Sequence, residues 1–205
     1  MAPIAGVARE IEALHDGALA RWYAGGLVDS EDGEDGDDLE ALVLAQHRCN
    51  FDLWGLEDEA RRRDVGDAVI ATVKRSIDAA NQRRNDLIER VDELVLAEFA
   101  AVDLSRSQLH SETAGQMIDR LSILALKIRN LGAIARDHAD AAIARECADK
   151  VVVLAAQRAD LAGCLRQLLD DFAAGRRHFK SYKQFKAYND PRLNPALVSA
   201  GDGGD

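Results

Sequence analysis

Five side chains that could bind a ligand recur along one stretch of the sequence, residues 46–61. They follow one another at steps of three or four residues: His47, Asn50, Trp54, Glu57 and Arg61. Steps of this size place side chains on one face of an α-helix. The mixture is too polar for ordinary core, and the indole is unusual on a solvated face. The stretch therefore predicts a binding surface, with packing and surface residues of a plain helix as the alternative.

The same stretch offers an acid/base pair. His47 and Glu57 are the best candidates, because imidazole and carboxylate groups commonly transfer protons in catalysis. Ten residues of helix separate them by about 15 Å of rise, so they could not act on one bond together. A partner from another helix, Glu112 or Asp119, would be required. The catalytic candidates are thus His47, Glu57 and Glu112, but the sequence by itself predicts no reaction.

A second polar cluster interrupts the apolar stripe of the next predicted helix. Asn81 and Asn85 lie four residues apart and face the same way. Asparagine is mildly unfavourable inside a helix because its amide competes for backbone partners, so we look for something that the pair binds. A solvated helix face explains the pair equally well.

A third cluster follows a predicted helix start. Ser111 or Thr113 can cap the helix, and Gly115 lets another backbone or a ligand approach closely. Asp119 and Arg120 follow as polar candidates, and a guanidinium suits a phosphate, so Arg61 or Arg120 would take one. The residues expected to bind the ligand are Asn50, Trp54, Arg61, Asn81, Asn85, Asp119 and Arg120.

Helices must position these clusters. Apolar residues recur every three or four positions over residues 4–22, 39–63, 67–99 and 111–128, and a fifth helix is expected at 138–175 after a break at 130–137. Aromatic residues are only 5% of the chain and prolines number three, a composition that favours helices. The sequence predicts an all-α fold, an elongated bundle of about five helices.

Composition excludes several classes of function. The formal net charge of −10 disfavours DNA binding, because the phosphate backbone would be repelled. The three cysteines fit no zinc spacing, and Glu12 and His15 have the E-x-x-H spacing of di-iron bundles without a second copy. His15 is therefore interpreted as an ordinary helix residue, and neither a metal nor a cofactor is expected. No apolar run of about eighteen residues could span a membrane, and we expect a cytoplasmic protein.

Two segments differ from the predicted bundle. Residues 25–38 form an acidic loop between the first two helices, and its carboxylates do not follow the ligand order of a calcium loop. Residues 176–192 hold six basic residues and four aromatics against one acid, which suits a phosphate with a flat ring or an acidic partner. The alternative is that this segment folds back over the acidic bundle. We expect one domain over residues 1–192, with 193–205 as a disordered tail.

Three segments, taken in order, resemble a known family. They are HRCNFDLW with LEDEAR in residues 47–61, NQRRND in residues 81–86, and SET, a glycine and IDRLSIL in residues 111–124. Together they resemble a bacterial family of unknown function, DUF4254, over residues 39 to about 195. Ala114 stands where the pattern would have a proline. The resemblance implies an association with genes for lipopolysaccharide and other cell-surface glycans, and it implies no reaction.

Two hypotheses of different classes follow. The first is a soluble accessory protein of cell-surface glycan biosynthesis that binds a phosphorylated sugar or nucleotide-sugar-like ligand in a polar cavity between helices. The second is an interaction module that docks on a glycosyltransferase or assembles with itself, without a small-molecule site. The first hypothesis expects His47, Asn81 and Glu112 to meet in one cavity.

Overall fold

The computed structural model describes residues 4–25, 38–181, 183 and 192–193. Within these residues the chain forms five α-helices and two short β-strands, which confirms the predicted all-α bundle. The elements are α1 (Ile4–Tyr23), α2 (Leu39–Glu59), α3 (Asp67–Glu98), β1 (Gln108–Leu109), α4 (Ala114–Asp137), α5 (Ala141–Ala173) and β2 (Arg177–His178). Nearly all of the predicted acidic loop and of the predicted tail lies outside the described residues.

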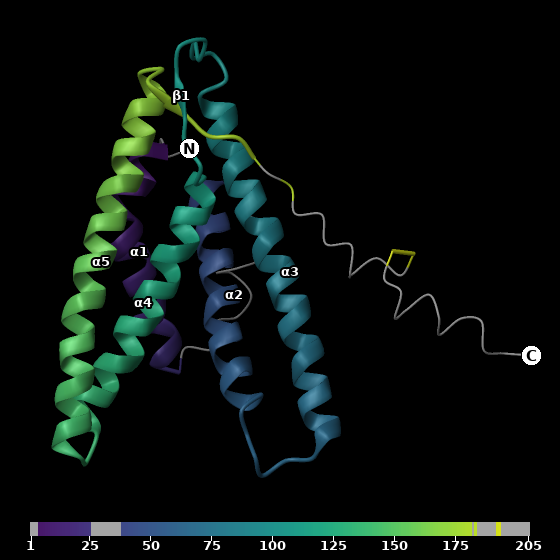
Figure 1. Ribbon diagram of the computed structural model, residues 1–205, viewed down its shortest axis with the longest axis vertical. Helices are drawn as coiled ribbons and strands as arrows, with labels where there is room; N and C mark the ends of the chain where they lie inside the picture. Colours follow the sequence, from purple (N-terminus) through teal and green to yellow (C-terminus); the bar gives the residue numbers. More distant parts are fainter. Residues whose placement is uncertain (1–3, 26–37, 182, 184–191, 194–205) are drawn as a thin grey trace, which may run out of the picture.

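Two antiparallel helical hairpins, α2 with α3 and α4 with α5, make up most of the bundle (Figure 1). The hairpins lie close together at their upper ends and diverge towards their lower ends. The first helix, α1, packs against α2, α4 and α5. Because α4 contacts each of the other helices, side chains on its different faces reach different neighbours.

Most helices begin where the capping residues indicate. Asp38 accepts a hydrogen bond from the backbone nitrogen of Ala41 at 2.8 Å and caps α2. Thr113 caps α4 in a capping box with Gln116, which accepts a hydrogen bond from the Thr113 backbone in return. The capping box confirms Thr113, one of the two caps expected for this helix.

Two predicted boundaries were wrong. The second helix ends at Glu59 rather than Arg63, and Arg62 closes the following turn through ion pairs with Glu59 at 3.1 Å and Asp64 at 2.7 Å. The fourth helix continues through the predicted break at 130–137. Asn130 is compatible with the helix because its amide donates to the Leu126 carbonyl oxygen at 2.9 Å. The break lies at residues 138–140 instead.

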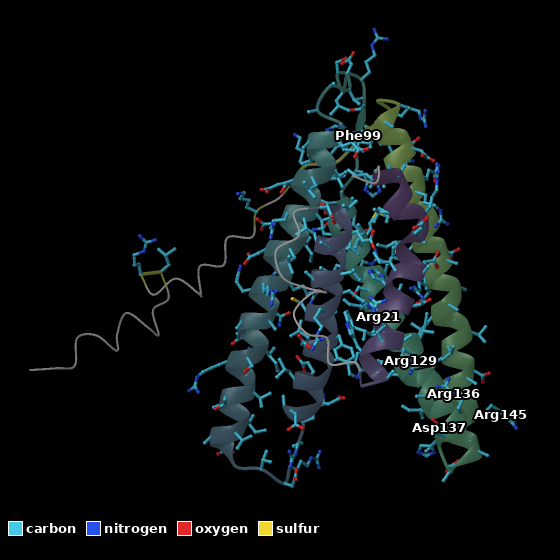
Figure 2. All side chains as sticks on the ribbon, turned by 180° about the vertical axis from the view of Figure 1, so that it is seen from behind. Arg21, Phe99, Arg129, Arg136, Asp137 and Arg145 are labelled. Atoms are coloured by element: carbon cyan, nitrogen blue, oxygen red, sulfur yellow. The ribbon has the colours of Figure 1, made fainter. Side chains whose placement is uncertain are left out.

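An aromatic cluster closes the upper end of the bundle, where Figure 2 labels Phe99. The Phe99 ring stacks on Phe172 with centroids 4.8 Å apart, and Phe179 meets Phe172 edge-on at 5.4 Å. Gly175 turns the chain back after α5 with a φ of +67°, a conformation that glycine adopts readily. The next residues form β2, which pairs in parallel with β1. The start of the basic, aromatic segment thus folds back onto the bundle.

Gly115 of α4 lies directly against the backbone of α3. Its backbone nitrogen donates to the buried carboxylate of Asp92 at 2.7 Å. A Cβ atom at Gly115 would lie 2.6 Å from the backbone carbonyl oxygen of Ile88, closer than real Cβ contacts come. The contact therefore requires glycine, as the sequence analysis expected of this position.

We predict that Gly115→Ala lowers the free energy of unfolding by about 1–3 kcal/mol, because the backbone of Ile88 cannot move aside without separating the helices. Gly55→Ala is the matched control, since a Cβ atom at Gly55 meets nothing within 4 Å. This control should stabilise the protein by roughly 0.5–1 kcal/mol, because alanine favours a helix over glycine. Chemical denaturation measures both effects. Equal changes in the two variants would contradict the assigned contact.

Candidate functional site

A groove of about 390 Å³ opens between α2, α3 and α4, and we call it the Trp54 groove. Its apolar lining comes from Leu53, Ile123 and Leu126. Its polar and aromatic lining consists of Asn50, Trp54, Glu57, Asp58, Arg61, Asn81 and Arg84. Five of these, Asn50, Trp54, Glu57, Arg61 and Asn81, are residues that the sequence analysis assigned to a binding face or an acid/base role. The helical spacing of α2 therefore does bring a predicted set together.

Buried side chains support the indole of Trp54 on the side away from the groove. It packs against a cluster of buried side chains from α1 and α4, which are Ala18, Leu19, Trp22, Ala125 and Leu126. One part of the ring is thus covered by core, and the half-buried remainder lines the groove. An aromatic ring fixed in this way offers a flat apolar surface at little conformational cost.

A buried carboxylate organises the polar side of the Trp54 groove. Asp119 on α4 is only 5% exposed and accepts hydrogen bonds from three side chains. Arg84 of α3 donates to it twice, from Nε at 2.8 Å and from Nη2 at 2.7 Å. From α2, Asn50 donates at 3.0 Å and Gln46 donates as well. A bidentate guanidinium pair of this kind is both strong and directional.

The amide of Asn50 is fixed by two acceptors. Its nitrogen donates to Asp119 and, at 2.9 Å, to the hydroxyl of Ser122. Because a carboxylate only accepts hydrogen bonds, the atom facing Asp119 must be the nitrogen, and the carbonyl oxygen lies on the other side. Asn81 is tied more weakly, through a contact of 3.4 Å from Arg84. Hydrogen bonds to Asp119 and Ser122 therefore orient the Asn50 amide, and a weaker bond from Arg84 orients that of Asn81.

His47 lies inside the bundle rather than along the groove, because its side chain is fully buried. Its Nε2 contacts the backbone oxygen of His15 at 3.2 Å, and since a carbonyl only accepts, Nε2 carries a proton. Burial lowers the pKa of His47 to about 4, so the ring is neutral and Nδ1 accepts. The Ser122 hydroxyl, 2.6 Å away, must therefore donate to Nδ1.

The Ser122–His47 pair resembles a nucleophile beside its base, but both side chains are fully buried. A substrate in the groove cannot reach the hydroxyl. The groove surface itself presents an aromatic ring, amides, carboxylates and guanidinium groups, which are groups that bind. Among the described residues there is no cluster of three or more His, Cys, Asp or Glu side chains that could hold a metal ion.

His15 is a core residue of this region. Its E-x-x-H spacing from Glu12 did not predict that it would be buried. Its ring lies 4.3 Å from the His47 ring between centroids, and Trp22 lies 5.1 Å from His47. Neither ring nitrogen of His15 has a hydrogen-bond partner within the described part of the chain. Burial, followed by the neighbouring His47 and Arg158, lowers the pKa of His15 well below its ordinary value.

The remaining predicted residues lie elsewhere. Glu112 and Arg120 form an ion pair at 2.7 Å and line a second groove, on the side of α4 that faces α5. Asn85 is half-buried on α3 and lines neither groove. His47, Asn81 and Glu112 consequently do not meet in one cavity: the first is enclosed in the core, and the other two line separate grooves.

Sequence reasoning missed four members of the buried network: His15, Gln46, Arg84 and Ser122. Helical spacing could have found three of them. Gln46 precedes Asn50 by four residues, Arg84 follows Asn81 by three, and Ser122 follows Asp119 by three. His15 carries no such signal, because its partner His47 is on another helix.

Comparison with known proteins gives one result. A family model described as "Protein of unknown function (DUF4254)" matches residues 40–181. No curated protein matches the chain, and neither does any solved structure. The matched range includes every residue that lines the Trp54 groove. In the described part of the chain, no helix has the length and apolar character needed to traverse a bilayer.

We predict that the protein loses stability as the pH falls from about 6.5 to about 4, because His15 and His47 are neutral when buried and bind protons more readily when unfolded. His15→Phe keeps an aromatic ring but removes one titrating group, so its loss of stability should be shallower. The pKa of Asp92, raised to about 6 mainly by burial, acts in the opposite direction in both proteins and cancels in the comparison.

The measurement is the free energy of unfolding by urea at a series of pH values. Each unit of separation between folded and unfolded pKa corresponds to about 1.4 kcal/mol. Parallel curves for the wild type and His15→Phe would show that His15 is not kept neutral by burial.

Proposed function

The chain belongs to the DUF4254 family, whose description names no function, and we propose from the Trp54 groove that the protein binds a phosphorylated sugar or nucleotide-sugar-like ligand. The single observation that carries this proposal is a supported aromatic ring beside oriented amides in one cavity. A sugar ring has an apolar face of C–H groups and a rim of hydroxyls. The groove offers a counterpart to each.

The aromatic part of the proposal rests on Trp54. Sugar C–H groups pack against an indole face, and this burial of apolar surface favours binding. Leu53, Ile123 and Leu126 extend the apolar lining of the groove. Ligand sites are typically apolar cavities with a few well-placed polar groups, and this groove has that character.

The polar part rests on Asn50, Asn81 and Arg84. The nitrogen of Asn50 already donates to Asp119 and Ser122, so its carbonyl oxygen is the atom that can accept from a sugar hydroxyl. The oxygen of Asn81 accepts from Arg84, so its nitrogen can donate to a second hydroxyl. Asp119 fixes Asn50 and Arg84 before any ligand arrives. A ligand then binds without a large ordering cost, because the polar groups are already in place.

A phosphate on the ligand is assigned to the rim. Arg61 is exposed and forms an ion pair with Glu57 at 2.8 Å, so a phosphate could replace this carboxylate as its partner. Arg84 is committed to Asp119 at the floor of the groove. The groove therefore recognises the sugar itself, with its phosphate held at the open edge.

The pathway follows from the resemblance noted in the sequence. An association with genes for cell-surface glycans agrees with a sugar-binding groove, and we assign the protein to a cytoplasmic accessory role in that biosynthesis. Within this role, a glycosyltransferase is the natural protein partner.

A second candidate function is an interaction module that assembles with itself or docks on a glycosyltransferase. Its specific support is apolar surface on α5, where Val152 is 70% exposed and Val153 is 56% exposed. Adjacent exposed valines are unusual in a chain with 30% charged residues. This candidate requires no small molecule.

We predict that a panel of sugar phosphates and nucleotide sugars contains a compound that raises the melting temperature of the wild type. At a hundredfold excess over its dissociation constant, such a ligand adds about 2.7 kcal/mol of stability. Trp54→Ala and Asn81→Ala should each weaken binding at least tenfold, about 1.4 kcal/mol. Asn85→Ala is the matched control, one helical turn along α3 but outside the groove.

Thermal shift identifies the ligand, and calorimetric titration measures its affinity for each variant. Equal losses in Asn81→Ala and Asn85→Ala would place the ligand elsewhere. No shift with any compound, together with a dimer that Val152→Asp disrupts in light scattering, would favour the interaction module.

A further inference from the structure

A second groove, which we call the Arg120 groove, lies beside the first across α4. It encloses about 740 Å³ between α4 and α5. Its apolar floor comes from Met117, Leu124 and Leu161. Ile123 borders both this groove and the Trp54 groove. The two cavities are therefore neighbours that meet at one side chain.

Two cationic side chains flank this meeting point. Arg120 precedes Ile123 by three residues and Lys127 follows it by four, so all three lie along one face of α4, where Arg120 and Lys127 are exposed and Ile123 is half-buried. Their backbone positions are separated by about 10 Å of helical rise. Both side chains are long enough to converge on one anion above Ile123.

The contact between Glu112 and Arg120 leaves donors for such an anion. Glu112 takes hydrogen bonds from one nitrogen of Arg120, Nη1, at 2.7 and 2.9 Å. Arg120 Nε and Nη2 do not take part in this pair, so they can donate to a second acceptor. Glu112 thus orients Arg120 without using all of its donors. Lys127 supplies a mobile point charge on the other side of Ile123.

We propose that the two grooves form one extended site for a nucleoside diphosphate sugar. The sugar occupies the Trp54 groove, and the nucleoside occupies the Arg120 groove. For this ligand class the phosphates lie away from Arg61: the diphosphate crosses α4 over Ile123 between Arg120 and Lys127. This inference rests on the proposed function and narrows its ligand class. It also gives Arg120 and Glu112, which lie outside the Trp54 groove, a place in the same site.

The Arg120 groove suits a nucleoside in three respects. It is the larger of the two cavities, it has an apolar floor against which a base can pack, and Gln157 and Asp160 line it with polar groups. A carboxylate is a common acceptor for ribose hydroxyls in nucleotide sites. The carboxylate of Asp160 would repel a phosphate, which is a reason to place it at the nucleoside end.

The inference is tested by calorimetric titration of the full chain with uridine and guanosine diphosphate sugars, the matching free nucleoside diphosphates and the matching sugar 1-phosphates. Arg120→Ala and Lys127→Ala should each weaken binding of a diphosphate sugar at least tenfold. The free diphosphate should show the same losses but no dependence on Trp54. Lys150→Ala, which removes an exposed lysine paired with Glu146, should change neither affinity.

Fluorescence gives an independent readout of where the sugar lies. The chain has two tryptophans, Trp22 and Trp54, so Trp22→Phe leaves Trp54 as the single reporter. A diphosphate sugar should change its emission, whereas the free diphosphate should not. The exposed variants Arg120→Ala and Lys127→Ala should unfold at the wild-type temperature, which separates lost binding from lost folding.

The outcomes separate this inference from the proposed function. Affinity for a diphosphate sugar that depends on Trp54 but not on Arg120 or Lys127 would overturn the extended site and leave the sugar groove standing. Binding that depends on Arg120 and Lys127 but not on Trp54 would overturn both the shared site and the sugar groove. Absence of binding by every compound would overturn both proposals.

Discussion

The carboxylate of Asp119 is the constraint on which the candidate site depends. A buried charge is costly unless hydrogen bonds and an opposite charge compensate it. Here Arg84 from α3 supplies the charge, and Gln46 and Asn50 from α2 supply further donors. Satisfying one side chain of α4 thus positions residues of two other helices. The polar wall of the groove is a consequence of that requirement.

The burial of this network separates two roles that the sequence had combined. His47 and Ser122 are enclosed, and their hydrogen bonds connect α1, α2 and α4. Trp54 and Asn81 are accessible at the groove and complete its surface. The enclosed pair therefore acts as support, while the accessible residues meet the ligand. Such division is expected where a binding surface must be rigid before the ligand arrives.

The central position of α4 explains why two grooves occur. Neighbouring residues on a helix point in directions about 100° apart, so Asp119 enters the core while Arg120 faces outward. Ile123 then lies between the two cavities. At the lower end the hairpins diverge (Figure 1), and Arg136 and Arg145 lie there, away from the aromatic closure at Phe99 (Figure 2). The grooves thus lie along α4 between these two ends.

Much of the fold could be predicted from local patterns, because apolar periodicity and caps such as Asp38 and Thr113 act within a few residues. The face of α2 was also predictable, since helical spacing places Asn50, Trp54, Glu57 and Arg61 together. The depth at which each of these residues lies in the bundle could not be predicted. His47 continues the same spacing but is covered by α1, a contact between residues distant in sequence.

The assignment of Glu112 to the same cavity failed for a similar reason. Periodicity along α4 gives the angle between two side chains around the helix axis, but it does not say which neighbouring helix each side chain faces. The break predicted near Asn130 was wrong because both ends of the Asn130 amide have partners within the helical conformation. Its nitrogen donates to the Leu126 carbonyl oxygen at 2.9 Å, and its oxygen accepts from the Tyr23 hydroxyl of α1 at 2.9 Å. Interhelical contacts of this kind leave no periodic signal in the sequence.

The most direct test of this account is the free energy of unfolding of Asp119→Asn compared with that of Glu57→Gln. Both substitutions remove one carboxylate charge at nearly constant size, but Asp119 is buried in the network and Glu57 forms an exposed ion pair. We expect a loss of about 3 kcal/mol for Asp119→Asn, because Arg84 loses its bidentate acceptor. For Glu57→Gln we expect a loss of less than about 1 kcal/mol. Equal and small losses of stability in the two variants would show that Asp119 does not hold α2, α3 and α4 together.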